Sequence, residues 1–214
     1  MARNRDPFTQ ALASLRERLL SGALAAGAPV IVQDEAGRLQ LSTTPVREAL
    51  ARLSGEGLVQ RAPSGGYVAT RLDAAAARDR YAMQGHFVRI AVELNASALG
   101  LLRPPAPPLE LRRPIAAVQQ LFAAIVISAG NEVLSEAHHR VSGQLDLLRR
   151  LESALFDDLS EEAAALYEAW TDASAGDFLI EVDRYHARRV GAAAALAALV
   201  HRPAGPEGVS AATA

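Results

Sequence analysis

The sequence predicts a mostly α-helical protein, with an N-terminal unit of three helices and a β-hairpin followed by an all-α helical bundle. Three observations predict this class. Half of the 214 residues are hydrophobic and only 5% are aromatic, so alanine-rich helices that pack closely are expected. Apolar residues recur at helical spacing along most of the chain. One hairpin signal separates the N-terminal helices from the later ones. We therefore expect domains over residues 1–72 and 73–202, and a disordered tail over 203–214.

Two helices are predicted before residue 40. Asp6 can cap the first helix, and Pro7 suits its first turn, because the N–H that proline lacks would be unpaired there. Apolar residues then recur at helical spacing, and Gly22 ends the pattern. An extended stretch is expected over residues 29–32, and a second helix over about 33–39.

A third helix is predicted to begin at residues 42–45, the sequence Ser-Thr-Thr-Pro, because hydroxyl groups cap helices and proline fits the first turn. Four apolar residues at helical spacing form its inward face: Val46, Ala49, Leu50 and Leu53. Gly55 lies at its end. Two short strand-like segments, 58–61 and 67–70, then flank Pro-Ser-Gly-Gly at 63–66, which is typical of a β-hairpin.

From residue 73 onward the pattern is helical throughout. A long helix is expected over about 73–102, and the proline-rich segment 103–108 must end it. Further helices are expected over about 114–128, 131–154, 160–174 and 178–200. Glycine followed by asparagine or aspartate marks two of the breaks between them.

The composition excludes several kinds of site. The chain has no cysteine, so disulfides, thiolate nucleophiles and cysteine-ligated metals are excluded, which suits a reducing cytoplasm. We see no signal peptide and no stretch of about 18 apolar residues, so we expect a cytoplasmic protein with no membrane partner. No nucleophile elbow, Walker loop or dinucleotide fingerprint is present, and we predict that the protein is not an enzyme.

The charge distribution favours a nucleic-acid partner for the N-terminal unit. The net charge is −2 at pH 7, but residues 1–72 carry nine arginines against six acidic residues. Three helices and a hairpin are the elements of a winged helix-turn-helix, whose third helix presents its N-terminal end to the major groove. That end carries Ser42, Thr43, Thr44 and Arg47. Its hydroxyl and N–H groups can meet phosphates, and its arginine can read base edges.

The segment Leu-Ser-Thr-Thr-Pro-Val-Arg-Glu-Ala-Leu at 41–50, with Leu53 and Glu-Gly-Leu-Val at 56–59, resembles the recognition-helix signature of GntR-family regulators. The resemblance covers about residues 12–70 and places the wing glycine at Gly65. It implies a transcription regulator that binds double-stranded DNA through this winged helix.

The resemblance has two departures: Thr43 and Gln33 stand where the family usually has arginine, which puts the strength or the sequence of DNA binding in doubt. The residues that we expect to contact DNA are Ser42, Thr43, Thr44, Arg47, Arg38, Arg52 and Gly65. For Arg52 and Arg61, a solvated surface role is an equal alternative.

Residues 73–200 resemble the all-helical ligand-binding domain of FadR-type GntR regulators, the FCD domain. The resemblance rests on Arg80 to Glu93, on the turn Ser128 to Leu134, and on Ala175 to His186. It implies an effector site, which in many members holds a divalent metal through one aspartate and three histidines. The corresponding positions here are Val118, Phe122, Leu166 and His186. One imidazole cannot hold such an ion, so we predict that metal and cofactor are absent.

The residues that we expect to line an effector pocket are Arg80, Val118, Phe122, Arg149, Leu166 and His186, with the arginines as partners for an anionic group. Alternatives remain open. His186 is more often an ordinary histidine than a ligand. Arg149 and Arg150 can be helix-surface charges, and His138 and His139 are expected at the surface. The short link 103–114 leaves open the loss of one helix and of small-molecule sensing.

The expected function is that of a homodimeric transcription regulator. The resemblance implies a repressor, because repression is commoner than activation in that family. It would bind a near-palindromic operator, because two-fold symmetry matches two half-sites. A small organic effector would modulate the DNA affinity. The alternative is a ligand-binding or dimerising protein with a vestigial DNA-binding module, which the threonine at position 43 supports.

Overall fold

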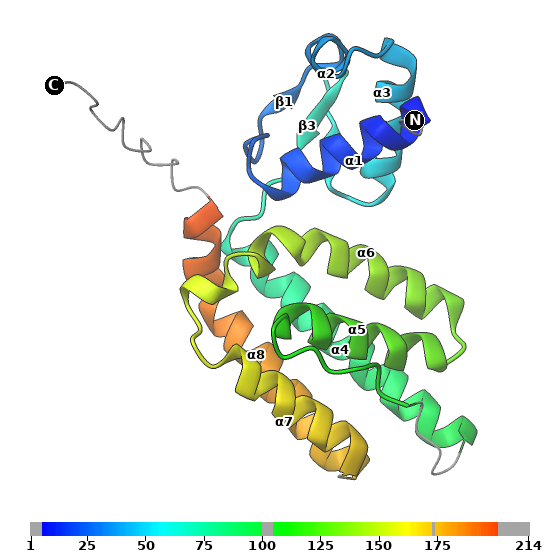
Figure 1. Cartoon of the computed structure of the whole chain (residues 1–214), viewed down its shortest axis with the longest axis vertical. Helices are drawn as coiled ribbons and strands as arrows, with labels where there is room; N and C mark the ends of the chain where they lie inside the picture. The colour runs from blue at the N-terminus through cyan, green and yellow to red at the C-terminus, as the bar shows by residue number, and fades with distance from the viewer. Residues whose placement is uncertain (1–5, 100–104, 173, 201–214) are drawn as a thin grey trace, which may run out of the picture.

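A computed structural model of the chain describes residues 6–99, 105–172 and 174–200, and shows two helical bodies joined end to end (Figure 1). The fold is mostly helical, as predicted, with a small sheet in the N-terminal body. The predicted tail 203–214 lies outside the described residues. No helix in the described part of the chain is long and apolar enough to cross a membrane.

The N-terminal body consists of three helices and a small sheet. Its elements are α1 (Pro7–Leu20), β1 (Pro29–Val30), α2 (Val32–Leu39), α3 (Thr43–Gly55), β2 (Val59–Arg61) and β3 (Tyr67–Ala69). The Asp6 carboxylate accepts a hydrogen bond from the Thr9 amide at 3.1 Å and so caps α1, as the Asp-Pro pair predicts.

The sheet differs from the predicted two-stranded hairpin. A third strand, β1, pairs antiparallel with β3 opposite Val68 and Tyr67. The strand order is therefore β1-β3-β2. Six residues of α1 and α3 are fully shielded from solvent: Ala11, Leu15, Val46, Ala49, Leu50 and Leu53. Because α3 is fixed by this apolar face, its opposite face is presented to solvent.

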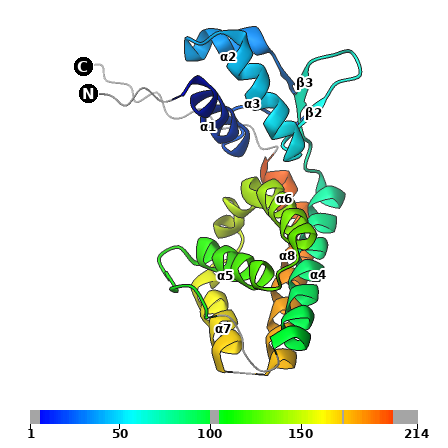
Figure 2. The same cartoon turned by 90° about the vertical axis from the view of Figure 1, so that its right-hand side faces the viewer.

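The C-terminal body is a helical bundle. Its elements are α4 (Ala74–Leu99), α5 (Pro114–Ser128), α6 (Glu132–Arg149), the 3-10 turn η1 (Glu152–Ala154), α7 (Leu159–Asp172) and α8 (Ala175–Val200). The long helices α4 and α8 lie side by side, and α5, α6 and α7 pack against them (Figure 2). Eighteen buried residues of these helices form one apolar core.

The sequence predicts one helix over 131–154, but α6 ends at Arg149 and a separate turn follows. The interruption brings the Glu152 carboxylate into the bundle, where it is fully buried. It accepts hydrogen bonds from the Tyr81 hydroxyl at 2.9 Å and from Arg189 Nη2 at 2.8 Å. Arg189 also pairs with Glu162 at 2.8 Å, so the buried charges are neutralised and hydrogen-bonded.

Polar contacts connect the two bodies. The Gln144 side chain on α6 donates to the Glu56 carbonyl of the N-terminal body at 3.1 Å, and within the helical body it accepts from Arg80 Nε at 2.7 Å. At the end of α6, Arg150 pairs with Glu17 of α1 at 3.0 Å. The helical body therefore contacts the N-terminal body chiefly through the second half of α6.

Candidate nucleic-acid interface

The first turn of α3 offers free hydrogen-bonding groups to solvent. Ser42 is the N-cap residue and has an extended backbone, with φ −70° and ψ 165°, but its side chain makes no capping hydrogen bond. Ser42 and Thr44 are exposed and Thr43 is half-buried. Since the first N–H groups of a helix have no partner within it, this end of α3 presents donors together with free hydroxyl groups.

One turn further along α3, Arg47 and Glu48 point outward, while Val46 and Leu50 are fully buried. Among the described residues, Arg47 has no ion-pair partner. Its guanidinium is therefore available to an external acceptor. Arginine is the side chain best suited to contact guanine or phosphate through two donors at once.

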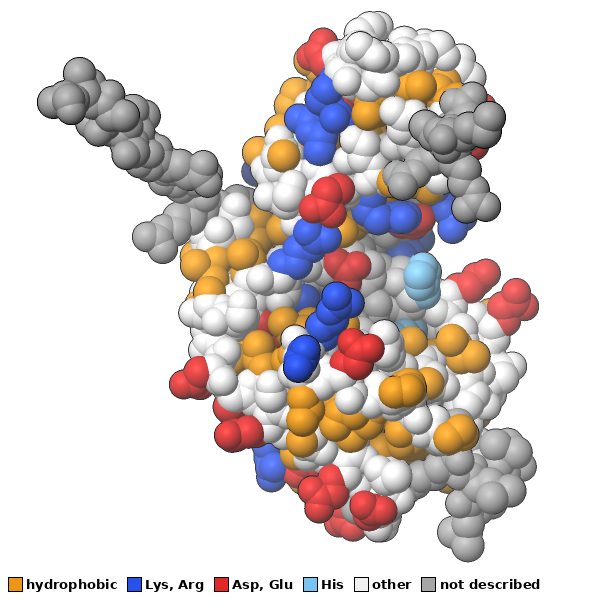
Figure 3. All heavy atoms as spheres, in the orientation of Figure 1, with side chains coloured by type: hydrophobic (Ala, Val, Ile, Leu, Met, Phe, Trp, Pro, Cys, Tyr) orange, Lys and Arg blue, Asp and Glu red, His pale blue; other side chains and the backbone are white. Residues whose placement is uncertain are grey.

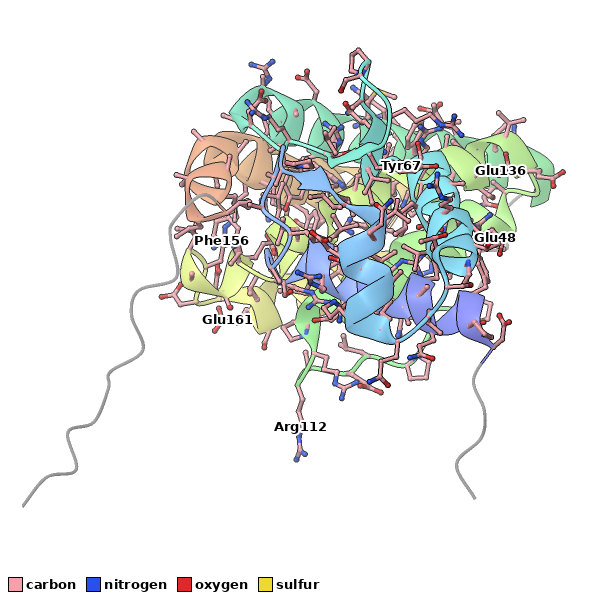
Figure 4. All side chains as sticks on the ribbon, turned by 90° about the horizontal axis from the view of Figure 1, so that it is seen from above. Glu48, Tyr67, Arg112, Glu136, Phe156 and Glu161 are labelled. Atoms are coloured by element: carbon pink, nitrogen blue, oxygen red, sulfur yellow. The ribbon has the colours of Figure 1, made fainter. Side chains whose placement is uncertain are left out.

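An open groove separates α3 from the hairpin of β2 and β3. Its α3 side is formed by Arg47, Glu48 and Ala51, and its hairpin side by residues 61–63 and 65–67. The Arg61 guanidinium lies 5.9 Å from the centre of the Tyr67 ring, which holds it beside the groove. Figure 4 looks onto this end of the molecule and labels Glu48 on α3 and Tyr67 on the hairpin.

The tip of the hairpin projects from the body (Figure 2). Gly65 and Gly66 are both exposed and have positive φ angles of 89° and 81°, which residues other than glycine rarely adopt. The backbone can therefore turn tightly at the tip without a side chain in front of it.

Two of the predicted DNA-contacting arginines are engaged within the protein. Arg38 donates to Glu35 at 2.9 Å and to the Ser14 hydroxyl at 2.7 Å. Arg52 pairs with Glu56 at 3.0 Å, although it is 64% exposed. The geometry therefore places Arg47 and Arg61 at the groove and Arg38 and Arg52 in pairs beside it. The role of Tyr67 beside the groove was not predicted. The position of an aromatic residue directly after the turn glycines is the sequence signal that could have indicated it.

The residues at the positions of the family's metal ligands lie in the bundle core. Val118, Phe122 and Leu166 are each at most 2% exposed. The Phe122 ring stacks on the His186 ring at 5.3 Å between centres. The described residues contain no group of three or more His, Asp or Glu side chains placed to hold a metal ion.

His186 is a buried, neutral histidine. Its Nδ1 donates to the Val182 carbonyl at 2.7 Å, and Nε2 has no partner. Burial lowers the pKa of His186 to about 3, because the protonated ring would carry its charge in an apolar core.

The structure corrects the expected surface position of His138, and it does not support the alternative of a surface role for Arg149. Arg149 is only 3% exposed and His138 only 4%. Both lie on the face of α6 that carries the buried Leu134 and Leu145, so the helix turns them into the bundle. Arg150 is 47% exposed and contacts the N-terminal body. Arg80 also lies at this junction, where it binds Gln144.

Comparisons with known proteins show which family the N-terminal body resembles. Residues 8–68 match the model of the family "Bacterial regulatory proteins, gntR family". A relative from Streptomyces ambofaciens, an uncharacterized HTH-type transcriptional regulator in an unstable DNA locus, is 40% identical over 99 residues. The match covers 46% of this chain and 40% of that protein, so the chain spans less than half of the relative's length.

Solved structures share the fold over most of the chain. E. coli McbR/YncC is 20% identical, and the match covers 88% of this chain and 97% of that one with a TM-score of 0.63. A GntR chain from Rhodococcus sp. RHA1 is 16% identical, with 86% and 98% coverage and a TM-score of 0.63. At these identities the likeness concerns the fold. The three helices and the hairpin beside α3 therefore lie in the segment, residues 8–68, that is similar to the gntR family of bacterial regulatory proteins.

Proposed function

We propose that the protein is a DNA-binding transcription regulator that reads its operator with the first two turns of α3. The observation that carries this proposal is the unpaired, exposed Arg47 beside the uncapped N-terminal end of α3, within a domain of the gntR family. The hydroxyl and N–H groups of residues 42–44 would bind phosphates and set the register. Arg47 would then meet a base edge.

The hairpin supplies a second contact. Arg61, held against the Tyr67 ring, would bind the backbone on the far side of the groove, and the exposed glycines at the tip allow close approach to the duplex. The DNA would then be contacted both by α3 and by the hairpin beside it. The two contacts together would fix how far α3 enters the major groove.

We further propose that the protein acts as a cytoplasmic homodimer, because one winged helix makes too few contacts for tight binding. Met83, Phe87 and Ile90 follow one another at helical spacing along α4, and Met83 and Ile90 are 43% and 41% exposed. Ile180 on the neighbouring α8 is 56% exposed. These apolar side chains support a dimer surface on the helical body, which we assign to the FCD type. The protein would act as a repressor, and a small-molecule effector bound to the helical body would weaken its binding to DNA.

The test is fluorescence anisotropy on the full chain with a duplex selected from a random library, over a range of salt concentrations. Arg47→Ala is compared with Arg184→Ala, which removes another exposed charge, from α8. We expect Arg47→Ala to cost about 1–3 kcal/mol, or roughly fivefold to 150-fold in affinity, and the control to bind like the wild type.

A steep loss of wild-type affinity with salt is also expected, because phosphate contacts release counterions. Weak binding that depends neither on DNA sequence nor on Arg47 would contradict the proposal. It would favour the alternative of a ligand-binding protein whose winged helix is vestigial.

A further inference from the structure

A groove opens on the helical body between the start of α5 and the end of α6. Its volume is about 650 Å³, within the usual range for small-molecule sites. Residues Arg113, Pro114 and Ile115 form one side, and Arg149 and Arg150 the other. Figure 3 shows basic side chains gathered on the face of the molecule where α5 and α6 lie in front.

Arg149 is the buried member of this lining. Its Nη1 donates to the Ser142 carbonyl at 2.7 Å and to Asp146 at 3.0 Å, but Nε and Nη2 have no partner. The Nε2 of Gln119, on the α5 side, also lacks a partner. A buried guanidinium normally has its donors satisfied, because an unpaired buried donor costs free energy. This part of the groove therefore has a surplus of donors.

The surroundings add to the positive character of the groove. Arg112 and Arg113 lie exposed at its rim, and Figure 4 shows Arg112 extending away from the ribbon. Arg113 is the N-cap residue of α5 and makes no side-chain capping bond, so the first turn of α5 also has free N–H groups. Asp146 is the acidic residue of the lining, and its carboxylate is already paired with Arg149.

We propose that this groove binds a small organic anion, a carboxylate or phosphate group on a short apolar body. The anionic group would accept hydrogen bonds from Nε and Nη2 of Arg149 and from Gln119. The apolar body would lie against Pro114, Ile115 and Leu159. Arg149 Nε and Nη2 and Gln119 Nε2 are all shielded from solvent, so binding requires side chains at the inner end of the groove to shift.

The position of the groove links it to the winged helix. Arg150, the next residue along, holds Glu17 of α1, and Gln144 one and a half turns earlier on α6 holds the Glu56 carbonyl. A ligand at Arg149 would press on the part of α6 that carries both contacts. This consequence for DNA rests on the proposed function, whereas ligand binding itself does not.

The first experiment is isothermal titration calorimetry on the full chain without DNA. Hexanoate and hexyl phosphate are the two anionic probes, and hexan-1-ol is the neutral control. We expect one of the anions to bind and the alcohol not to, and the anion that binds identifies the class. Arg149→Met should weaken binding at least tenfold, while Arg184→Met, which removes an exposed arginine of α8, should leave it unchanged.

Arg149→Met should remain folded by circular dichroism, because it removes a buried charge whose donors are only partly satisfied. Should that variant not fold, Gln119→Leu takes its place and should weaken binding several-fold. Equal binding of the alcohol, no binding of either anion, or full binding by both variants would overturn the site. DNA affinity is measured separately with and without the bound anion, and an unchanged value would overturn the link to the winged helix.

Discussion

The packing of single side chains decides which chemistry the helical body can perform. His186 packs against the rings of Phe122 and Tyr185, with centres 5.3 and 5.0 Å away. Beside it, a Cβ on Gly85 would come within 3.0 Å of the His186 ring, so α4 approaches the ring closely. The histidine therefore fills space in the core and stays neutral, and its unpartnered Nε2 is buried away from solvent.

Buried His186 makes the stability of the protein fall in acid. The pKa of His186 is lowered from 6.5 to about 3 by burial, so below pH 6.5 the unfolded chain binds a proton that the folded chain does not. Its contribution to stability is complete above pH 6.5 and is lost between pH 6.5 and 3, at roughly 1.4 kcal/mol per pH unit. His138, whose pKa burial lowers to about 4, acts in the same direction.

We therefore expect His186→Leu to flatten the fall of the free energy of unfolding between pH 6.5 and 4.5, measured by urea denaturation. His139→Leu is the control, because His139 is exposed on the same helix as His138. Parallel pH curves for His186→Leu and the wild type would show that His186 takes up its proton in the folded protein.

At the scale of elements, helices could be predicted closely and their buried polar residues could not. Pro114 and the Gly130 turn place α5 correctly, because proline and glycine act locally on the backbone. The pairing of β1 with β3 depends on a contact between segments almost forty residues apart, which no local pattern shows. The burial of Arg149 depends in the same way on where α5 lies beside α6.

The surface prediction for His138 failed although a local signal existed. Leu134, His138 and Leu145 recur at spacings that put them on one face of α6. A polar residue within an apolar stripe is buried with it when the stripe faces a core. Of the residues proposed to contact DNA, those on α3 could be predicted from the sequence, whereas the stacking of Arg61 on Tyr67 needs the geometry of the hairpin.

The N-caps of two helices should respond differently to alanine. The Asn131 side chain accepts a hydrogen bond from the Leu134 amide at 3.0 Å, so Asn131→Ala should cost about 1 kcal/mol of stability. Ser42 caps nothing with its side chain, so Ser42→Ala should leave the urea midpoint unchanged and weaken DNA binding. A matching loss of stability in Ser42→Ala would mean that its hydroxyl serves the fold of α3 and is not reserved for phosphate.

At the scale of the whole molecule, the orientation of the winged helix rests on a few polar contacts around α6. Gly57 has a positive φ of 77°, and a Cβ there would come within 2.1 Å of Gln144 Nε2, so the turn after α3 and α6 meet closely. The exposed Arg150–Glu17 pair completes the junction, and its hydrogen bonds lower the pKa of Glu17. Contacts of this kind are weaker than either apolar core, so the two bodies can change their relative orientation without unfolding.

Gln144→Ala should loosen the junction while both bodies stay folded. It removes the hydrogen bond to the Glu56 carbonyl, which joins the two bodies and is worth about 0.5–1.5 kcal/mol, or roughly twofold to tenfold in the population of separated bodies. Limited trypsin digestion measures this at the exposed Arg71, in the link between β3 and α4. Release of the 71-residue N-terminal fragment should accelerate by that factor, because cleavage follows the open population.

The matched control for this digestion is Gln120→Ala, which removes an exposed amide from α5, and it should be cleaved like the wild type. High salt should accelerate cleavage further in Gln144→Ala, since it screens the exposed Arg150–Glu17 pair that remains. Equal cleavage rates in the two variants at every salt concentration would show that Gln144 does not hold the bodies together. The orientation of the winged helix would then depend on the apolar residues at the junction, where Leu20, Leu72 and Val200 line a small cavity between the bodies.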